Sequence, residues 1–123
     1  MPKVKYDSKM DPECIALCDA LNEIPKIVTT ESCCGHGKRN FLVFFTTDSF
    51  EALAEVCYYF HQCHSGVVDW KVIARTDCSM AANRFMIEGP VGDFKGAEQI
   101  AKVILHYLQI KEELAPLGAK NVG

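Results

Sequence analysis

Apolar residues recur with helical spacing near the start of the chain. Asp11 precedes Pro12, a combination typical of an N-cap followed by proline at the first helical position. The pattern predicts a helix within residues 12–24, running from Pro12 to about Glu23 and ended by Pro25. Its buried stripe follows the i, i+3, i+4, i+7 rule and consists of Cys14, Leu17, Cys18 and Leu21.

The rest of the chain shows two successive units, each with two strand patterns and one helix pattern. In the first unit, residues 27–63, the segments 27–32 and 41–45 predict strands around a loop at 33–40. Asp48 or Ser49 then caps a helix that continues to about Cys63. In the second unit, residues 70–110, strands are predicted at 70–76 and 84–88, and Asp93 caps a helix to about Ile110.

A constant offset of 44 positions relates the two units. Agreement between loop, strand and cap positions indicates an internal duplication. Because a hairpin must cover its apolar face, we expect an α+β fold. It should be a two-layer sandwich of duplicated β-β-α units with an extra N-terminal helix and one mainly antiparallel sheet of about four strands. The offset aligns Cys34 with Cys78, Phe41 with Phe85, Ser49 with Asp93 and Phe50 with Phe94.

The whole chain, residues 1–123, reads as a single domain. Residues 111–123 should form a tail, loose from Pro116 onward, because they lack periodicity. The run at 41–45 is apolar on both faces of its strand, so the second face of the sheet needs a cover. That cover is the N-terminal helix or another subunit, and we expect a homo-oligomer, most simply a dimer.

Composition narrows the compartment and the class of partner. The chain carries 13 Lys+Arg and 16 Asp+Glu, a net charge of −3, which disfavours coating of a long nucleic acid. No apolar run approaches the roughly 18 residues of a membrane span, and the first residues lack a signal-peptide pattern. We therefore expect a cytoplasmic protein. Its 7 cysteines, an odd number, should be free thiols, with Cys14 and Cys18 in the core.

The loop at 33–40 carries the strongest functional signal, Cys-Cys-Gly-His-Gly-Lys-Arg. Two glycines bracket the histidine and permit positive φ, and successive N–H groups in such a turn form an anion-binding nest. The basic pair adds a point charge and a planar fork suited to a phosphate or carboxylate. The glycine spacing is not that of a Walker A loop. The predicted ligand-binding set here is Thr30, Ser32, Cys33, Gly35, His36, Gly37, Lys38 and Arg39.

The corresponding loop of the second unit supplies more polar groups. If a pseudo-twofold axis relates the units, both loops face one cleft. A ligand with a flat ring and a phosphate suits such a cleft, with Trp70, Tyr58 or Tyr59 available for stacking. The predicted ligand-binding set then extends to Arg75, Asp77, Ser79, Asn83 and Arg84.

Two other chemistries remain open at the first loop. Cys33, Cys34 and His36 are zinc-ligand types, although the paired knuckles of structural zinc sites are missing from the sequence. A thiol nucleophile activated by His36 and the basic pair is the second alternative. The sequence places no carboxylate to orient the imidazole, and Glu31 is the nearest one.

The segment from Ile27 to His36 resembles a family of tRNA methyltransferases. Thr-Thr-Glu-Ser-Cys-Cys-Gly-His at 29–36 is similar to Thr-Thr-Ser-Ser-Cys-Ser-Gly-Arg of the wybutosine-pathway enzymes, which also follows a strand and opens a hairpin. The resemblance implies an α/β fold and S-adenosylmethionine-dependent methylation of a modified guanosine in tRNA. The family's arginine is His36 here and its second serine is Cys34. The residues that carry over are Thr29, Thr30, Ser32, Cys33 and Gly35.

The Cys-Cys-Gly-His-Gly segment is also similar to short hypothetical proteins of Firmicutes and their phages. Small phage proteins of this kind include sponges that sequester nucleotide second messengers, an analogy at the level of the class. The leading hypothesis is a non-catalytic protein that binds a phosphate-bearing, nucleotide-like small molecule. The alternatives are an S-adenosylmethionine-dependent methyltransferase acting on a nucleoside or tRNA, and a zinc-binding interaction module.

Overall fold

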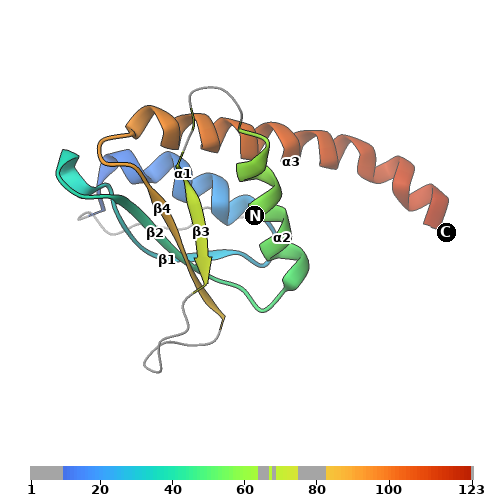
Figure 1. The fold of residues 1–123 in the computed structure, drawn as a ribbon. Helices are drawn as coiled ribbons and strands as arrows, with labels where there is room; N and C mark the ends of the chain where they lie inside the picture. Colours follow the sequence, from blue (N-terminus) through green and yellow to red (C-terminus); the bar gives the residue numbers. More distant parts are fainter. Residues whose placement is uncertain (1–9, 64–66, 68, 75–82, 123) are drawn as a thin grey trace.

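The described part of the computed structural model contains three α-helices and four strands (Figure 1). The structure describes residues 10–63, 67, 69–74 and 83–122. In chain order the elements are α1 (Pro12–Glu23), β1 (Val28–Cys33), the 3-10 turn η1 (Gly35–Gly37), β2 (Phe41–Thr46), α2 (Phe50–His61), β3 (Lys71–Ala74), β4 (Arg84–Gly89) and α3 (Phe94–Val122).

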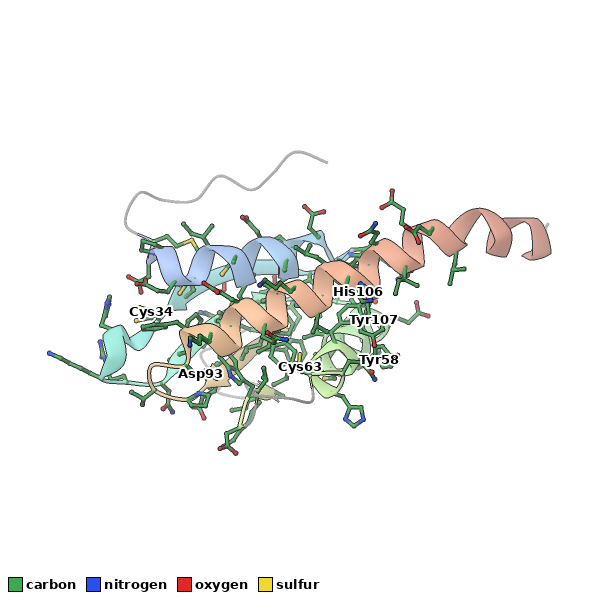
Figure 2. The ribbon with its side chains drawn as sticks, turned by 90° about the horizontal axis from the view of Figure 1, so that it is seen from above. Cys34, Tyr58, Cys63, Asp93, His106 and Tyr107 are labelled. Carbon is green, nitrogen blue, oxygen red and sulfur yellow. The ribbon has the colours of Figure 1, made fainter. Side chains whose placement is uncertain are left out.

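The four strands form one antiparallel sheet in the order β1-β2-β4-β3. Within it β1 pairs with β2, β3 pairs with β4, and β2 pairs with β4 in the middle. The helices lie on one side of the sheet, and α1 packs beside α3 (Figures 1 and 2). The arrangement confirms the predicted α+β sandwich with an extra N-terminal helix.

A pseudo-twofold relation links the inner halves of the two β-β-α units. Val43 pairs directly with Ile87, its counterpart 44 positions later, so the axis passes beside this pair. The helices keep the same offset, since α2 begins at Phe50 and α3 begins at Phe94. The inner strands and their helices are therefore duplicated as predicted.

The outer strands do not share this offset. Cys33 pairs with Leu42, whereas Met86, 44 positions after Leu42, pairs with Ile73. Cys33 thus corresponds to Ile73 at an offset of 40, because four more residues separate Ile73 from its partner Met86 than separate Cys33 from its partner Leu42. The predicted alignment of Cys34 with Cys78 is not tested, because residue 78 lies outside the described residues.

Apolar side chains from both layers meet between the sheet and the helices. The predicted stripe of α1 is buried in full, with every member at most 1% exposed. Asn22, near the end of α1, donates its Nδ2–H to Oγ1 of Thr29 at 2.8 Å and accepts the Thr29 N–H at 2.9 Å, which fastens α1 to β1. The largest fully buried side chains include Leu17, Leu21, Phe41, Val43, Phe45, Val56, Ile87, Ile100 and Ile104.

Both predicted caps of the later helices are present. Oγ of Ser49 accepts the N–H of Ala52 at 3.1 Å, and Oδ1 of Asp93 accepts the N–H of Gly96 at 3.1 Å. Asp93 also accepts the indole N–H of Trp70 at 2.8 Å. The ring of Trp70 packs against the core, so this residue has a structural role and does not form a stacking platform.

The outer face of the sheet carries half-buried apolar side chains crossed by charged ones. The guanidinium of Arg84 lies 4.8 Å above the ring of Phe44 and pairs with Glu31 at 3.3 Å. Lys71 and Glu88 approach each other at 4.0 Å on the same face. Because α1 packs against α3 and β1 on the other side, the N-terminal helix is not the cover of this face.

The last helix is longer than the sequence pattern predicts. We expected it to end near Ile110 and a loose tail to follow, but α3 continues to Val122. Lysine, glutamate, leucine and alanine favour a helix from Lys111 to Ala115, whereas Pro116 and Gly118 are unfavourable in a helix interior and are the reason the sequence predicts a tail there. Among the residues the structure describes, no helix is long and apolar enough to cross a membrane.

Candidate metal centre

The loop between β1 and β2 has three consecutive residues in the left-handed conformation. The φ angle is 78° at Gly35, 53° at His36 and 75° at Gly37. Glycine adopts such angles freely, whereas a residue with a Cβ loses about 1–2 kcal/mol. The predicted positive φ values are therefore confirmed, and the strained histidine lies between them. Strain of this kind is concentrated at functional sites.

We expect Gly35→Ala to destabilise the protein more than Gly37→Ala. A Cβ at position 35 would lie 2.8 Å from the carbonyl oxygen of Asn40, whereas position 37 faces open space. Both variants carry the backbone cost of about 1–2 kcal/mol, and the clash at position 35 adds about 1–3 kcal/mol. Urea unfolding measures the difference, and equal losses in the two variants would contradict the close approach at Gly35.

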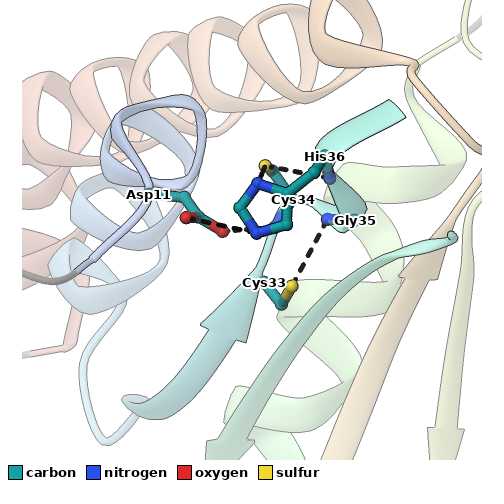
Figure 3. A network of polar contacts seen from close by, with 5 residues as sticks. All are labelled: Asp11, Cys33, Cys34, Gly35 and His36. Carbon is teal, nitrogen blue, oxygen red and sulfur yellow. Dashed lines mark hydrogen bonds and ion pairs between the residues drawn. The ribbon is translucent and has the colours of Figure 1, made fainter. Parts of the chain in front are cut away.

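Asp11, directly before α1, fastens this loop to the helix layer (Figure 3). Its Oδ2 accepts the backbone N–H of Cys34 at 2.9 Å, and its Oδ1 lies 3.8 Å from Nε2 of His36. The side chain makes no capping bond to its own helix, unlike the predicted N-cap, because the loop amide takes the carboxylate instead. The bond from Cys34, and to a lesser extent the nearby His36, holds the pKa of Asp11 below its usual value.

Two thiols and the imidazole ring complete the cluster. Gly35 donates its N–H to Sγ of Cys33 at 3.4 Å, and His36 donates its N–H to Sγ of Cys34 at 3.4 Å. The Sγ of Cys34 also lies 3.7 Å from Nδ1 of His36, so one ring nitrogen faces a thiol and the other faces Asp11 (Figure 3). Burial raises the pKa of the Cys34 thiol, which is 2% exposed.

These contacts occupy the amides that the predicted anion nest requires. The N–H groups of residues 34–36 donate to the Asp11 carboxylate and to the two sulfurs. The N–H groups of Lys38 and Arg39 donate to the carbonyl oxygen of Gly35 at 2.9 Å and 3.0 Å. The nest is therefore not formed as predicted, because these donors have partners within the chain. The side chains of Lys38 and Arg39 are exposed.

Asp11, Cys33 and His36 bring three potential metal ligands together. A carboxylate oxygen, a thiol sulfur and an imidazole nitrogen all lie within 4.8 Å of one another. Zinc binds such atoms at about 2.0–2.3 Å, so tetrahedral ligands are roughly 3.3–3.8 Å apart and a small inward shift suffices. Asp11 and Cys33 are half-buried and His36 is exposed, which leaves one side of the cluster open to solvent.

Thr30 and Ser32 flank the cluster without joining it. Thr30 lies at the bulge of β1, where its Oγ1 donates to the carbonyl oxygen of Phe44 at 3.4 Å. The Ser32 hydroxyl interacts with the thiols of Cys14 and Cys18 on α1. Their part in ligand binding stays a prediction.

The second predicted part of the site is not brought to the first loop. Because β2 and β4 are antiparallel, Arg84 pairs with Thr46, at the end of β2 farthest from the first loop, about 17 Å along the strand. Next to it, Asn83 donates its Nδ2–H to Asp48 at 2.8 Å. The prediction that both loops face a single cleft is therefore wrong for Asn83 and Arg84. Residues 75, 77 and 79, predicted as Arg75, Asp77 and Ser79, lie outside the described residues.

The sequence did not reveal the carboxylate of this cluster. Glu31, the nearest candidate, pairs instead with Arg84 on the outer face of the sheet. The proposed stacking residues Tyr58 and Tyr59 lie on α2, and Figure 2 shows Tyr58 well away from Cys34. The sequence signal for Asp11 lies in the lengths of the α1 and β1 segments.

Comparison of the chain with protein-family models, curated proteins and solved structures finds no match in any of the three. The resemblance to tRNA methyltransferases stays a prediction. The functional argument therefore depends on the geometry of Asp11 and the segment Cys33–His36.

Proposed function

We propose that the cluster of Asp11, Cys33 and His36 binds a divalent transition metal ion, with Zn²⁺ as the best fit. The observation that carries the proposal is the convergence of three different ligand atoms within 4.8 Å. A thiol, an imidazole and one carboxylate form a donor set typical of zinc, whereas magnesium and calcium prefer oxygen ligands throughout.

The charges in the cluster favour a cation. The lowered pKa of Asp11 keeps its carboxylate ionised and able to donate an electron pair. Gly35 directs its N–H at Sγ of Cys33 at 3.4 Å, and the thiolate is the form of cysteine that ligates a metal. A bound divalent ion supplies the largest local charge and promotes loss of the thiol proton.

Cys34 serves as a positioning residue for the imidazole. Its Sγ is 3.7 Å from Nδ1 of His36, which leaves Nε2 directed toward Asp11 and the metal position. A partner on the second ring nitrogen fixes the tautomer and orientation of a ligating histidine. With three protein ligands, a fourth position remains on the open side for water or a small molecule.

Lys38 and Arg39 favour a second candidate function at the same loop, the binding or sequestration of a phosphate-bearing, nucleotide-like ligand. Both side chains are exposed and directly follow the loop glycines. Guanidinium and ammonium groups bind phosphate strongly, and the open metal position accepts an anionic oxygen. In this second function the side chains of Lys38 and Arg39, together with the metal, bind the phosphate. The backbone amides of the loop do not take part, because they donate to groups within the chain.

Cobalt titration of the metal-free protein tests the metal site. Co²⁺ bound to a thiolate gives a charge-transfer absorption in the near ultraviolet, and we expect saturation at one equivalent per chain with displacement by Zn²⁺. Cys33→Ser should remove the band. Cys34→Ser should retain the band, because Cys34 orients His36 and does not ligate the metal. Its loss should weaken cobalt binding about 10- to 100-fold, as loss of a residue that orients a metal ligand does.

Cys57→Ser is the matched control, because Cys57 is an exposed free thiol on α2. It should bind cobalt as the unmodified protein does. A missing band in the unmodified protein, or an unchanged band in Cys33→Ser, would overturn the metal site. Lys38→Ala and Arg39→Ala should leave the cobalt band unchanged; a roughly tenfold or larger loss of nucleoside monophosphate affinity in these variants supports the second candidate.

A further inference from the structure

Cys33, the last residue of β1, lies on a different face of the sheet from the other thiols near it. It pairs with Leu42, whose half-buried side chain belongs to the outer face, and directly opposed residues of two strands share a face. Cys14 and Cys18 are 0% and 1% exposed in the core under α1, and Cys34 is 2% exposed. Of these four thiols, only that of Cys33 is accessible from solvent.

The surroundings of Cys33 are those of a reactive thiol. Its side chain is half-buried, and the exposed His36 leaves the cluster open on one side. The N–H of Gly35 donates to its Sγ at 3.4 Å, and a ring nitrogen of His36 lies within 4.8 Å of the same sulfur. Reactive cysteines occupy partly exposed sites beside such groups, whereas cysteines buried in the core are inert. A small oxidant therefore reaches Cys33 first among the four.

We propose that Cys33 is a reversible oxidation site through which a hydroperoxide releases the metal ion, an inference that rests on the metal site proposed above. The Cys33 sulfur attacks the hydroxyl oxygen of the hydroperoxide, so that an S–O bond forms and the O–O bond breaks. The sulfur is oxidised by two electrons to a sulfenic acid. The peroxide is reduced to an alcohol, or to water when it is hydrogen peroxide. The departing oxygen takes the thiol proton, or a proton from water if a metal ion has already displaced the thiol proton.

Oxidation at this position removes one of the three protein ligands. A sulfenic acid lacks the negative thiolate sulfur that binds zinc, and only Asp11 and His36 then remain of the cluster. Zinc sites in proteins use at least three protein ligands. The metal ion therefore dissociates when Cys33 is oxidised.

The sulfenic acid has no thiol beside it on the same face among the described residues. Cys34 directs its sulfur toward the N–H of His36, whereas Cys33 directs its sulfur toward the N–H of Gly35 (Figure 3). The product therefore persists until a small thiol reduces it. The first thiol molecule forms a mixed disulfide with Cys33 and releases water. A second displaces the Cys33 thiol and leaves a disulfide of the reductant.

Peroxide treatment of the zinc-loaded protein tests the proposal. Hydrogen peroxide is added with dimedone, which traps sulfenic acids, and peptide mass spectrometry locates the adduct while a chelating dye reads the released zinc. We expect at least about tenfold more adduct on Cys33 than on the exposed Cys57, and zinc release equal to the oxidised fraction of Cys33. Without dimedone, dithiothreitol should restore zinc binding.

The zinc content before peroxide is added separates this inference from the metal site itself. A protein that holds zinc but carries its adduct elsewhere, or keeps its zinc when Cys33 is oxidised, overturns the oxidation site alone. A protein that holds no zinc at the start overturns the metal site and the release together. A disulfide that joins Cys33 to another cysteine of the chain contradicts the persistent sulfenic acid. Cys57→Ser is the matched control and should be oxidised at Cys33 and release zinc as the unmodified protein does.

Discussion

Replacing Asp11 with alanine should remove metal binding and also destabilise the fold. The carboxylate accepts the Cys34 N–H at 2.9 Å and faces Nε2 of His36 at 3.8 Å, so one substitution removes a ligand and the tie between α1 and the loop. A part-buried N–H left without its acceptor costs about 1–3 kcal/mol. Metal affinity should fall about 100-fold or more, which is a larger loss than removal of a residue that only orients a metal ligand causes.

Asp11→Asn separates these two effects. The amide oxygen still accepts the Cys34 N–H, so the free energy of unfolding should stay close to that of the unmodified protein. The negative charge is lost, so cobalt affinity should still drop. Glu13→Ala is the control, because Glu13 is another carboxylate in the first turn of α1 and lies outside the cluster. Wild-type cobalt affinity in Asp11→Asn and Asp11→Ala would remove Asp11 from the site.

Raising the pH from about 8 to about 10.5 should lower the free energy of unfolding by about 2–4 kcal/mol through two buried thiols. Burial raises the pKa of Cys14 to about 12 and that of Cys18 to about 11. In the unfolded chain the same thiols titrate near about 8.5. The folded state therefore holds both protons longer, and this contribution is complete below the unfolded pKa and is lost as the pH rises toward 11 and 12.

The matched comparison is the double variant Cys14→Ala, Cys18→Ala. All other ionisable residues are the same in the two proteins, so the difference between the two pH profiles isolates the thiols. Urea unfolding across the range should show a shallower decline in the double variant. Two profiles of the same slope would show that these thiols do not ionise more readily on unfolding.

Local sequence patterns were sufficient for most of the fold. The i, i+3, i+4, i+7 stripe of α1 is buried, and Ser49 and Asp93 cap the helices at the predicted positions. Each of these features depends on residues within a few positions of one another. The pairing of Val43 with Ile87 also follows the repeat seen in the sequence, because equivalent strands meet at a twofold axis.

Features that depend on distant segments were not predicted. The sequence predicts one cleft for both sets of polar residues, but the antiparallel pairing of β2 and β4 puts Arg84 beside Thr46, at the end of β2 farthest from the first loop. The sequence predicts Asp11 only as the N-cap of α1, although the lengths of α1 and β1 also place Asp11 close to the end of β1. Twelve residues of helix rise about 18 Å and six residues of strand span about 20 Å, so β1 returns its end to the start of α1.

The metal cluster breaks the internal symmetry of the chain. In the register of the sheet, the position that corresponds to Cys33 in the second unit is Ile73, a side chain that cannot ligate a metal. Among the described residues, the position that corresponds to Cys33 therefore supplies no metal ligand in the second unit. If the two units descend from one ancestral β-β-α segment, the proposed metal site would depend on Cys33 of the first copy and on Asp11, which lies before both units.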